Sequence, residues 1–138
     1  MDGIINYLNT DLDVTSASDL TSLAATFEAG GVSPLHVTRG DDGLWRAVFE
    51  TDNQYTDPET TISEMLAVVE SLCPSRQSIW SGCSQREFNV GYDCGTEPWA
   101  FNQGLSTELL GRMAAVGASL RITLYPDRVH AKPNATQD

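Results

Sequence analysis

Apolar residues recur along this chain with two different periods, and the switching between them constrains the fold more than any other feature. In residues 7–14 every second side chain from Leu8 to Val14 falls on one face. That alternation is typical of a half-buried β-strand. From Leu20 to Phe27 the apolar residues instead recur at positions i, i+3, i+4 and i+7, as in an amphipathic helix. A chain with both patterns is expected to pack helices against a sheet.

The same two periods divide the rest of the sequence. Strands are expected at 7–14, 33–38, 44–50, 86–93 and 120–125. Helices are expected from a capping box at Ser16 to Gly30, from Asp57 to Pro74, and from Ser106 to Gly117, with one further short turn in 75–82. These starts carry N-cap residues, and a proline follows Asp57 at the first helical position. The glycines and aspartates of 39–43 predict a hairpin turn.

The resulting order is β-α-β-β-α-β-α-β. Strands with one apolar face, and a hairpin near the middle of the chain, favour an α+β fold over repeated parallel βαβ units. We therefore expect one domain over 1–126, built as a mainly antiparallel five-stranded sheet with helices packed on one face. The polar tail 127–138 is expected to be disordered.

The charge is distributed unevenly. Residues 1–60 hold eleven acidic side chains against two basic ones, Arg39 and Arg46, out of a net charge of −11 for the whole chain. Such a field attracts cationic partners and repels nucleic acids and anionic membranes. The chain has no G-x-G-x-x-G or Walker-type phosphate loop, and Lys132 is its single lysine. Nucleic-acid binding is therefore not expected.

Targeting features point to a cytoplasmic protein. No apolar run approaches the ~20 residues that span a bilayer, and the first residues, Met1 to Asn6, lack the basic region of a signal peptide. The odd number of cysteines, Cys73, Cys83 and Cys94, fits neither a disulfide framework nor a zinc motif. We expect Cys73 to be buried on the second helix and no disulfide to form.

Few residues suggest catalysis or cofactor binding. The two histidines are His36, on the polar side of an expected strand, and His130, in the expected tail, so a histidine triad or a zinc site is not expected. Asp11 and Asp13 project on one face of a strand, as paired carboxylates do in some hydrolases, but solvated strand acids show the same pattern. We assign no catalytic residue, cofactor or metal and favour a protein without enzymatic activity.

Two groups of residues are candidates for binding a partner. The first is the acidic set, which we expect to form one continuous negative surface: Asp11, Asp13, Asp41, Asp42 and Asp52. The second is the segment 92–103, in which aromatic, amide and acidic side chains alternate with glycines: Tyr92, Asp93, Glu97, Trp99, Asn102 and Gln103. Rigid aromatic anchors beside polar groups are typical of binding hot spots. Trp99 and Phe101 have an alternative role, closing the end of the core.

Two functions remain open. The first is a non-catalytic acidic protein, of the inhibitor or immunity type, that docks a basic protein partner; its size, acidity and layout resemble those of small bacterial immunity proteins that neutralise toxic nucleases. The alternative is a small-molecule-binding domain or enzyme built around 92–103. The first predicts acids gathered on one face, and the second predicts a cleft where Asp93, Glu97 and Asn102 or Gln103 converge. We favour the first. The oligomeric state is left open.

Overall fold

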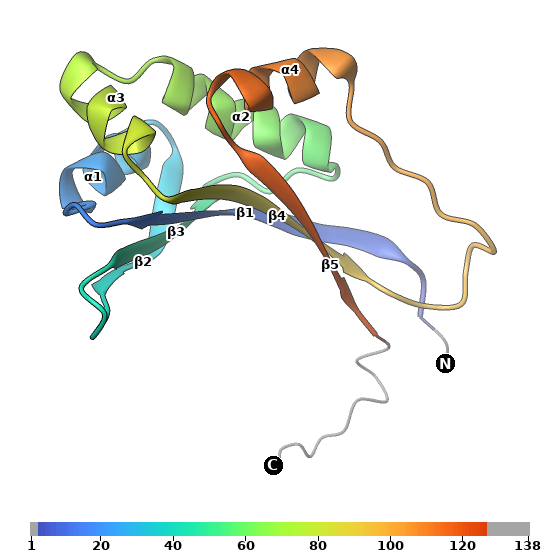
Figure 1. Ribbon diagram of the computed structural model, residues 1–138. Helices are drawn as coiled ribbons and strands as arrows, with labels where there is room; N and C mark the ends of the chain where they lie inside the picture. Colours follow the sequence, from blue (N-terminus) through green and yellow to red (C-terminus); the bar gives the residue numbers. More distant parts are fainter. Residues whose placement is uncertain (1–2, 127–138) are drawn as a thin grey trace.

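The computed structural model describes residues 3–126, which form a single α+β domain (Figure 1). The strands are β1 (Asn6–Ser16), β2 (Val32–Arg39), β3 (Trp45–Thr51), β4 (Gln85–Asp93) and β5 (Ser119–Tyr125). The helices are α1 (Thr21–Ala29), α2 (Pro58–Glu70), α3 (Pro74–Ser81) and α4 (Thr107–Ala115). Residues 127–138, the predicted disordered tail, lie outside the described part of the chain.

The five strands form one mixed sheet in the order β2-β3-β1-β4-β5. The β1–β3, β1–β4 and β2–β3 pairs are antiparallel, whereas β5 runs parallel to β4. The expectation of a mainly antiparallel sheet is therefore corrected to a mixed one. The reason is that α4 carries the chain back along the sheet between β4 and β5, and a crossover of this kind returns the strand in the parallel sense.

The helices lie on one face of this sheet (Figure 1), as the sequence predicts. Alternate residues of the strands point toward them and are fully buried, among them Leu12, Phe49 and Phe88, which the strand register places side by side. The helices contribute a second layer that includes Phe27, Met65 and Trp80: Phe27 contacts the rings of both Phe49 and Trp80. Within residues 3–126, no helix covers the opposite face of the sheet.

Local signals place two helices correctly and one incorrectly. The side chains of Asp57 and Ser106 accept hydrogen bonds from the backbone N–H groups of Thr60 and Leu109, as N-caps do. Ser16, however, does not begin a helix. It is the last residue of β1 and pairs with Trp45, and its hydroxyl accepts from the Ser18 N–H. Pairing in the sheet overrides the local capping pattern, so α1 starts later.

A second prediction that the structure corrects concerns Cys73. It was predicted to be buried on the second helix, but α2 ends at Glu70 and Cys73 is an exposed residue at the start of α3. Pro74 causes the change, because it begins a separate helix rather than bending α2. A hydrogen bond with the Ser75 hydroxyl lowers the pKa of the Cys73 thiol. All three cysteines are free.

One arginine joins the helices to the sheet. Arg86, on β4, donates from Nε to the Gly117 carbonyl at 3.0 Å and from Nη1 to the carbonyls of Trp80, Ser81 and Cys83 at 2.8–3.1 Å. These carbonyls lie at the ends of α3 and α4, where helix backbone acceptors lack partners. The Trp80 indole N–H donates to the Val116 carbonyl beside them. The turn that leads into β5 is thus fixed against β4.

Within residues 3–126 no helix combines the length and the apolar character needed to cross a bilayer.

Replacing Arg86 with methionine is expected to lower the free energy of unfolding by about 3 kcal/mol, because hydrogen bonds from a charged donor to several carbonyls are lost together. Arg39→Met removes the same charge from an exposed position on β2 and should change stability by less than about 0.5 kcal/mol. Urea unfolding followed by circular dichroism measures both. Equal stability of the two variants would contradict the role given to Arg86.

Candidate functional site

The uncovered face of the sheet gathers acidic side chains from three neighbouring strands. Asp11 and Asp13 alternate along β1 with the buried residues Thr10 and Leu12 and therefore point away from the helices. Glu87 on β4 pairs with Asp13, and Glu50 on β3 follows the inward-facing Phe49. We refer to Asp11, Asp13, Glu50 and Glu87 as the acidic face.

Crowding on this face makes ionisation costly. Burial, together with the charges of Glu50 and Asp13, raises the pKa of Asp11 from its ordinary 3.8 to about 6. The pKa of Asp13 is also raised, by burial and then by Glu87, against opposing effects of Arg121 and His36. Arg121 on β5 makes a 2.9 Å ion pair with Glu87. Because Asp11 and Asp13 are disfavoured as anions, an added positive charge would stabilise this arrangement.

A small polar hollow adjoins the acidic face. It has a volume of about 90 Å³ and lies between the N-terminal half of β1 and the segment that leaves β3, with Asn9, Glu50, Asp52, Gln54 and Tyr55 among its lining residues. The Tyr7 hydroxyl closes its inner side through hydrogen bonds with Thr10 and Thr61. The hollow thus has two carboxylates and several neutral polar groups in its wall.

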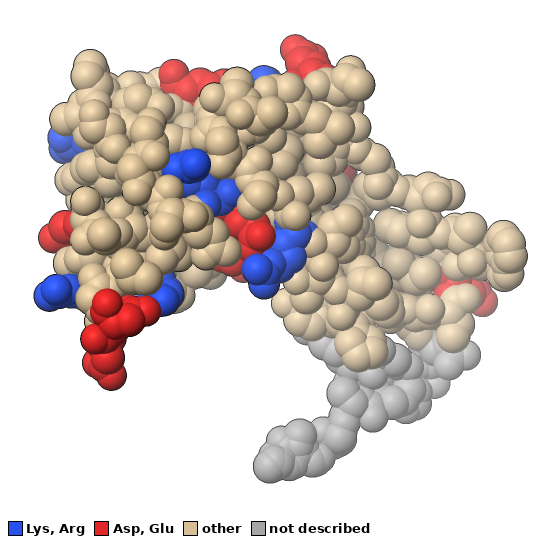
Figure 2. All heavy atoms as spheres, viewed as in Figure 1, with Lys and Arg blue, Asp and Glu red and all other residues tan. Residues whose placement is uncertain are grey.

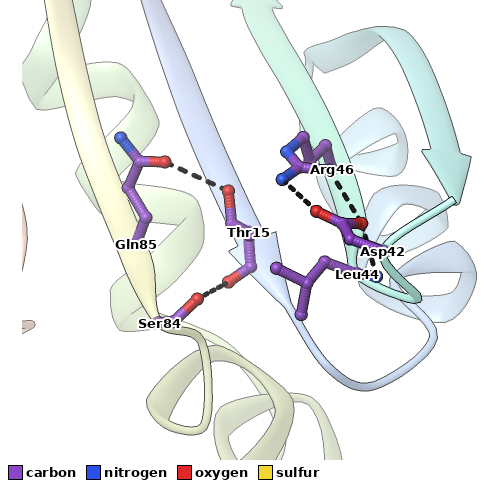
Figure 3. Close-up of polar contacts among 6 residues, drawn as sticks. All are labelled: Thr15, Asp42, Leu44, Arg46, Ser84 and Gln85. Atoms are coloured by element: carbon purple, nitrogen blue, oxygen red, sulfur yellow. Dashed lines mark hydrogen bonds and ion pairs between the residues drawn. The ribbon is translucent and has the colours of Figure 1, made fainter. Parts of the chain in front are cut away.

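The five predicted acids do not all gather together. Asp11 and Asp13 lie on the acidic face, and Asp52 lies at its margin, where its carboxylate accepts a hydrogen bond from the Ser33 hydroxyl. Asp41 and Asp42 are in the turn of the β2–β3 hairpin, at the other end of β3. Asp42 is neutralised there by Arg46, with an Nη2–Oδ2 distance of 2.8 Å (Figure 3). The Arg46 guanidinium and the Leu44 N–H hold the pKa of Asp42 at about 2.

A second candidate surface is an apolar groove of about 240 Å³ beside β5, on the helix side of the sheet. Its lining consists mainly of Val90, Tyr92, Leu105, Leu110, Leu120 and Ile122. A shallower hollow of about 180 Å³, which includes Phe101 and Leu124, continues it along the strand. Ile122 and Leu124 are 59% and 61% exposed. The helices therefore leave the apolar row of β5 uncovered.

The segment 92–103 borders this groove but does not converge on it. Tyr92 and Gln103 line the groove, and Phe101 contacts the Tyr92 ring edge-on with 5.7 Å between centroids. Asp93 alternates with Tyr92 along β4 and so faces the other side of the sheet. Trp99 is 97% exposed, which excludes its role as a plug of the core.

Both ends of this loop are anchored. At its start the Thr96 N–H donates to the Gly3 carbonyl and the Ile5 N–H donates to the Glu97 carbonyl. Gly95 lies so close to the Gly3 backbone that a Cβ atom there would clash with it. At its end the Glu59 carboxylate accepts from both the N–H and the hydroxyl of Ser106. The loop therefore holds the exposed Trp99 on a fixed base.

Sequence reasoning missed several residues of these surfaces. Glu50 and Glu87 were not assigned, although Glu50 directly follows the apolar residues of one expected strand and Glu87 directly precedes those of another, so that alternation already showed which face each occupies. Leu120, Ile122 and Leu124 were expected to lie in a strand but were not assigned to a binding surface, because alternation shows which residues share a face and does not show whether a helix covers that face.

Known proteins do not identify either surface. No family model, curated protein or solved structure matches the chain. Among residues 3–126, no group of three or more His, Cys, Asp or Glu side chains is arranged to hold a metal ion.

The raised pKa of Asp11 predicts a pH-dependent effect of Asp11→Asn. The ionised carboxylate is disfavoured in the fold, so the stability linked to Asp11 is complete below pH 3.8 and is lost as the pH rises through about 6. We expect the variant to be more stable than the parent by about 1 kcal/mol at neutral pH, after allowance for solvent screening, and nearly equal to it near pH 4.

Urea unfolding at the two pH values measures this difference. Asp41→Asn is the matched control, since it makes the same chemical change in the exposed hairpin turn. A variant at Asp11 that is less stable than the parent at neutral pH would show that the acidic face is not crowded.

Proposed function

We propose that this protein is a non-catalytic binding protein, of the inhibitor or immunity type, that docks a basic protein partner on the acidic face. The observation that carries the proposal is the position of Asp11, which is half-buried on an uncovered sheet face and lies within the field of Asp13 and Glu50. A lysine or arginine of a partner would relieve this repulsion on binding. The relief of repulsion would then contribute to the free energy of binding.

The polar hollow beside the acidic face suggests how one such side chain would be received. Glu50 and Asp52 are in its wall, and its volume of about 90 Å³ suits the end of one side chain rather than a substrate molecule, since small-molecule sites have volumes of roughly 300–1,000 Å³. A cationic head group in the hollow would meet carboxylates, and its aliphatic stem would pass Tyr55.

The alternative function, a small-molecule site around 92–103, has less support. Its expected cleft required Asp93, Glu97 and Asn102 or Gln103 to converge, and of these only Gln103 lines the apolar groove. Glu97 and Asn102 are exposed. The groove walls are mainly aliphatic and aromatic, which favours a macromolecular contact over acid–base chemistry.

The acidic face predicts position-specific binding of a cationic probe. We expect the double variant Asp11→Asn/Asp13→Asn to bind a fluorescent oligolysine peptide at least about 10-fold more weakly than the parent, because close charge pairs contribute well over 1 kcal/mol each. The parent affinity should fall as salt is added. Fluorescence anisotropy at low and at physiological salt measures both effects.

The matched control is Glu28→Gln/Glu64→Gln, which removes the same two charges from exposed positions on α1 and α2. It should weaken binding by less than about 3-fold. Equal losses in the two double variants would mean that the peptide responds to net charge alone, and the acidic face would then have no special role.

A further inference from the structure

The two edges of the sheet differ in how they are protected. β2, at one edge, contains Pro34 and an irregularity of register between Pro34 and His36, both of which hinder the addition of another strand. β5, at the other edge, has regular pairing with β4 over its whole length and no proline, lysine or bulge between Ser119 and Tyr125. An unprotected edge of this kind is a template for further strand pairing.

The backbone of β5 shows which groups are available. The Tyr125 carbonyl accepts from the Cys94 N–H, toward β4. Because successive residues of a strand direct their N–H and C=O groups to opposite sides, Thr123 and Arg121 also face β4. The N–H and C=O groups of Leu120, Ile122 and Leu124 then point away from the sheet. The residues with outward backbone groups are thus those whose apolar side chains are exposed.

The pattern of apolar and polar residues in β5 is symmetric about Ile122. Leu120 and Leu124 lie two residues to either side, and Arg121 and Thr123 one residue to either side. If two copies pair antiparallel with Ile122 on the two-fold axis, Leu120 faces Leu124 of the other copy, Arg121 faces Thr123, and no like charges meet. A two-fold interface requires this self-complementarity, and an unrelated partner strand does not.

Two further observations favour a second copy of this chain as the partner of β5. Two copies that each carry −11 repel one another, but Arg121 is the single charged residue of β5, and Figure 2 shows few charged side chains on this side of the molecule. Residues 127–138 contain Val129 as their one large aliphatic residue, so they lack the apolar row needed to cover the groove.

We propose that the chain forms a two-fold homodimer by antiparallel pairing of β5 with β5 of a second copy. The outward groups of three residues in each chain would form about six backbone hydrogen bonds. The axis then runs perpendicular to the sheet, so both sets of helices lie on one side. The two apolar rows become neighbours, and each groove is closed by the row of the other copy. The acidic faces of the two copies join on the opposite side.

Sedimentation equilibrium of the full chain tests the dimer. We expect the dimer to have a dissociation constant below about 100 µM, since well-packed interfaces of ordinary size reach micromolar affinity. Ile122→Lys should raise the dissociation constant at least about 100-fold, because it places two unpaired ammonium groups in the interface. Leu35→Lys is the matched control: Leu35 is a 54% exposed apolar residue on the protected edge strand β2, and its replacement should leave the dimer intact.

A cross-link provides a second test that does not depend on how the lysine variant folds. Residues on the two-fold axis of such a pair have Cα atoms about 5.5 Å apart, within the range of a disulfide. Under oxidation Ile122→Cys should yield covalent dimer well above the background of the three native cysteines, and Leu35→Cys should not. A monomeric parent, a dimer that survives Ile122→Lys, or equal cross-linking of the two cysteine variants would each overturn the proposal.

Salt separates this dimer from the binding of a basic partner. Added salt screens the repulsion between two acidic chains and should strengthen the dimer, whereas it should weaken oligolysine binding. Dimerisation can therefore fail while the acidic face still binds its probe, and the reverse result is equally distinguishable.

Discussion

The hydrogen bonds of Arg86 fix the turn that leads into β5, and the position of β5 at the edge of the sheet depends on that turn. The Arg86 guanidinium on β4 donates hydrogen bonds to carbonyls at the ends of α3 and α4. The Trp80 indole N–H donates to the Val116 carbonyl in the same turn. From that fixed turn the chain continues along the outer edge of β4. β5 is therefore parallel to β4 and terminal in the sheet. The strand extends beyond α2 and α4 (Figure 1), and its side chains Ile122 and Leu124 are exposed.

The helices cover one side of the sheet, which leaves two regions of the strands in contact with solvent. One is the acidic face, where the central strand β1 presents Asp11 and Asp13 between the carboxylates of β3 and β4. The other is the exposed row of β5. Their chemistry differs: the first is half-buried and electrostatically strained, and the second is apolar and has unpaired backbone groups. The proposed cationic partner and the proposed second copy would therefore contact different parts of the molecule.

Much of the fold was predictable from the sequence, because strand alternation and helix caps act locally. Asp57 and Ser106 begin helices where their residue types indicate. Ser16 did not, because its pairing with Trp45 is a contact distant in sequence. For the site, alternation placed Asp11 and Asp13 on one face, but the separation of Asp42 from them depends on the length of the hairpin, and the exposure of Ile122 depends on where α4 lies. Neither is encoded by a local pattern.

The central claim is that the acidic face is the binding surface, and an NMR titration tests it most directly. Addition of the oligolysine peptide to ¹⁵N-labelled protein at low salt should shift the amide signals of β1, of β4 and of the segment around Glu50, while those of α1 and α3 on the opposite side remain unchanged. Shifts spread evenly over the surface, or centred on the helices, would contradict the account.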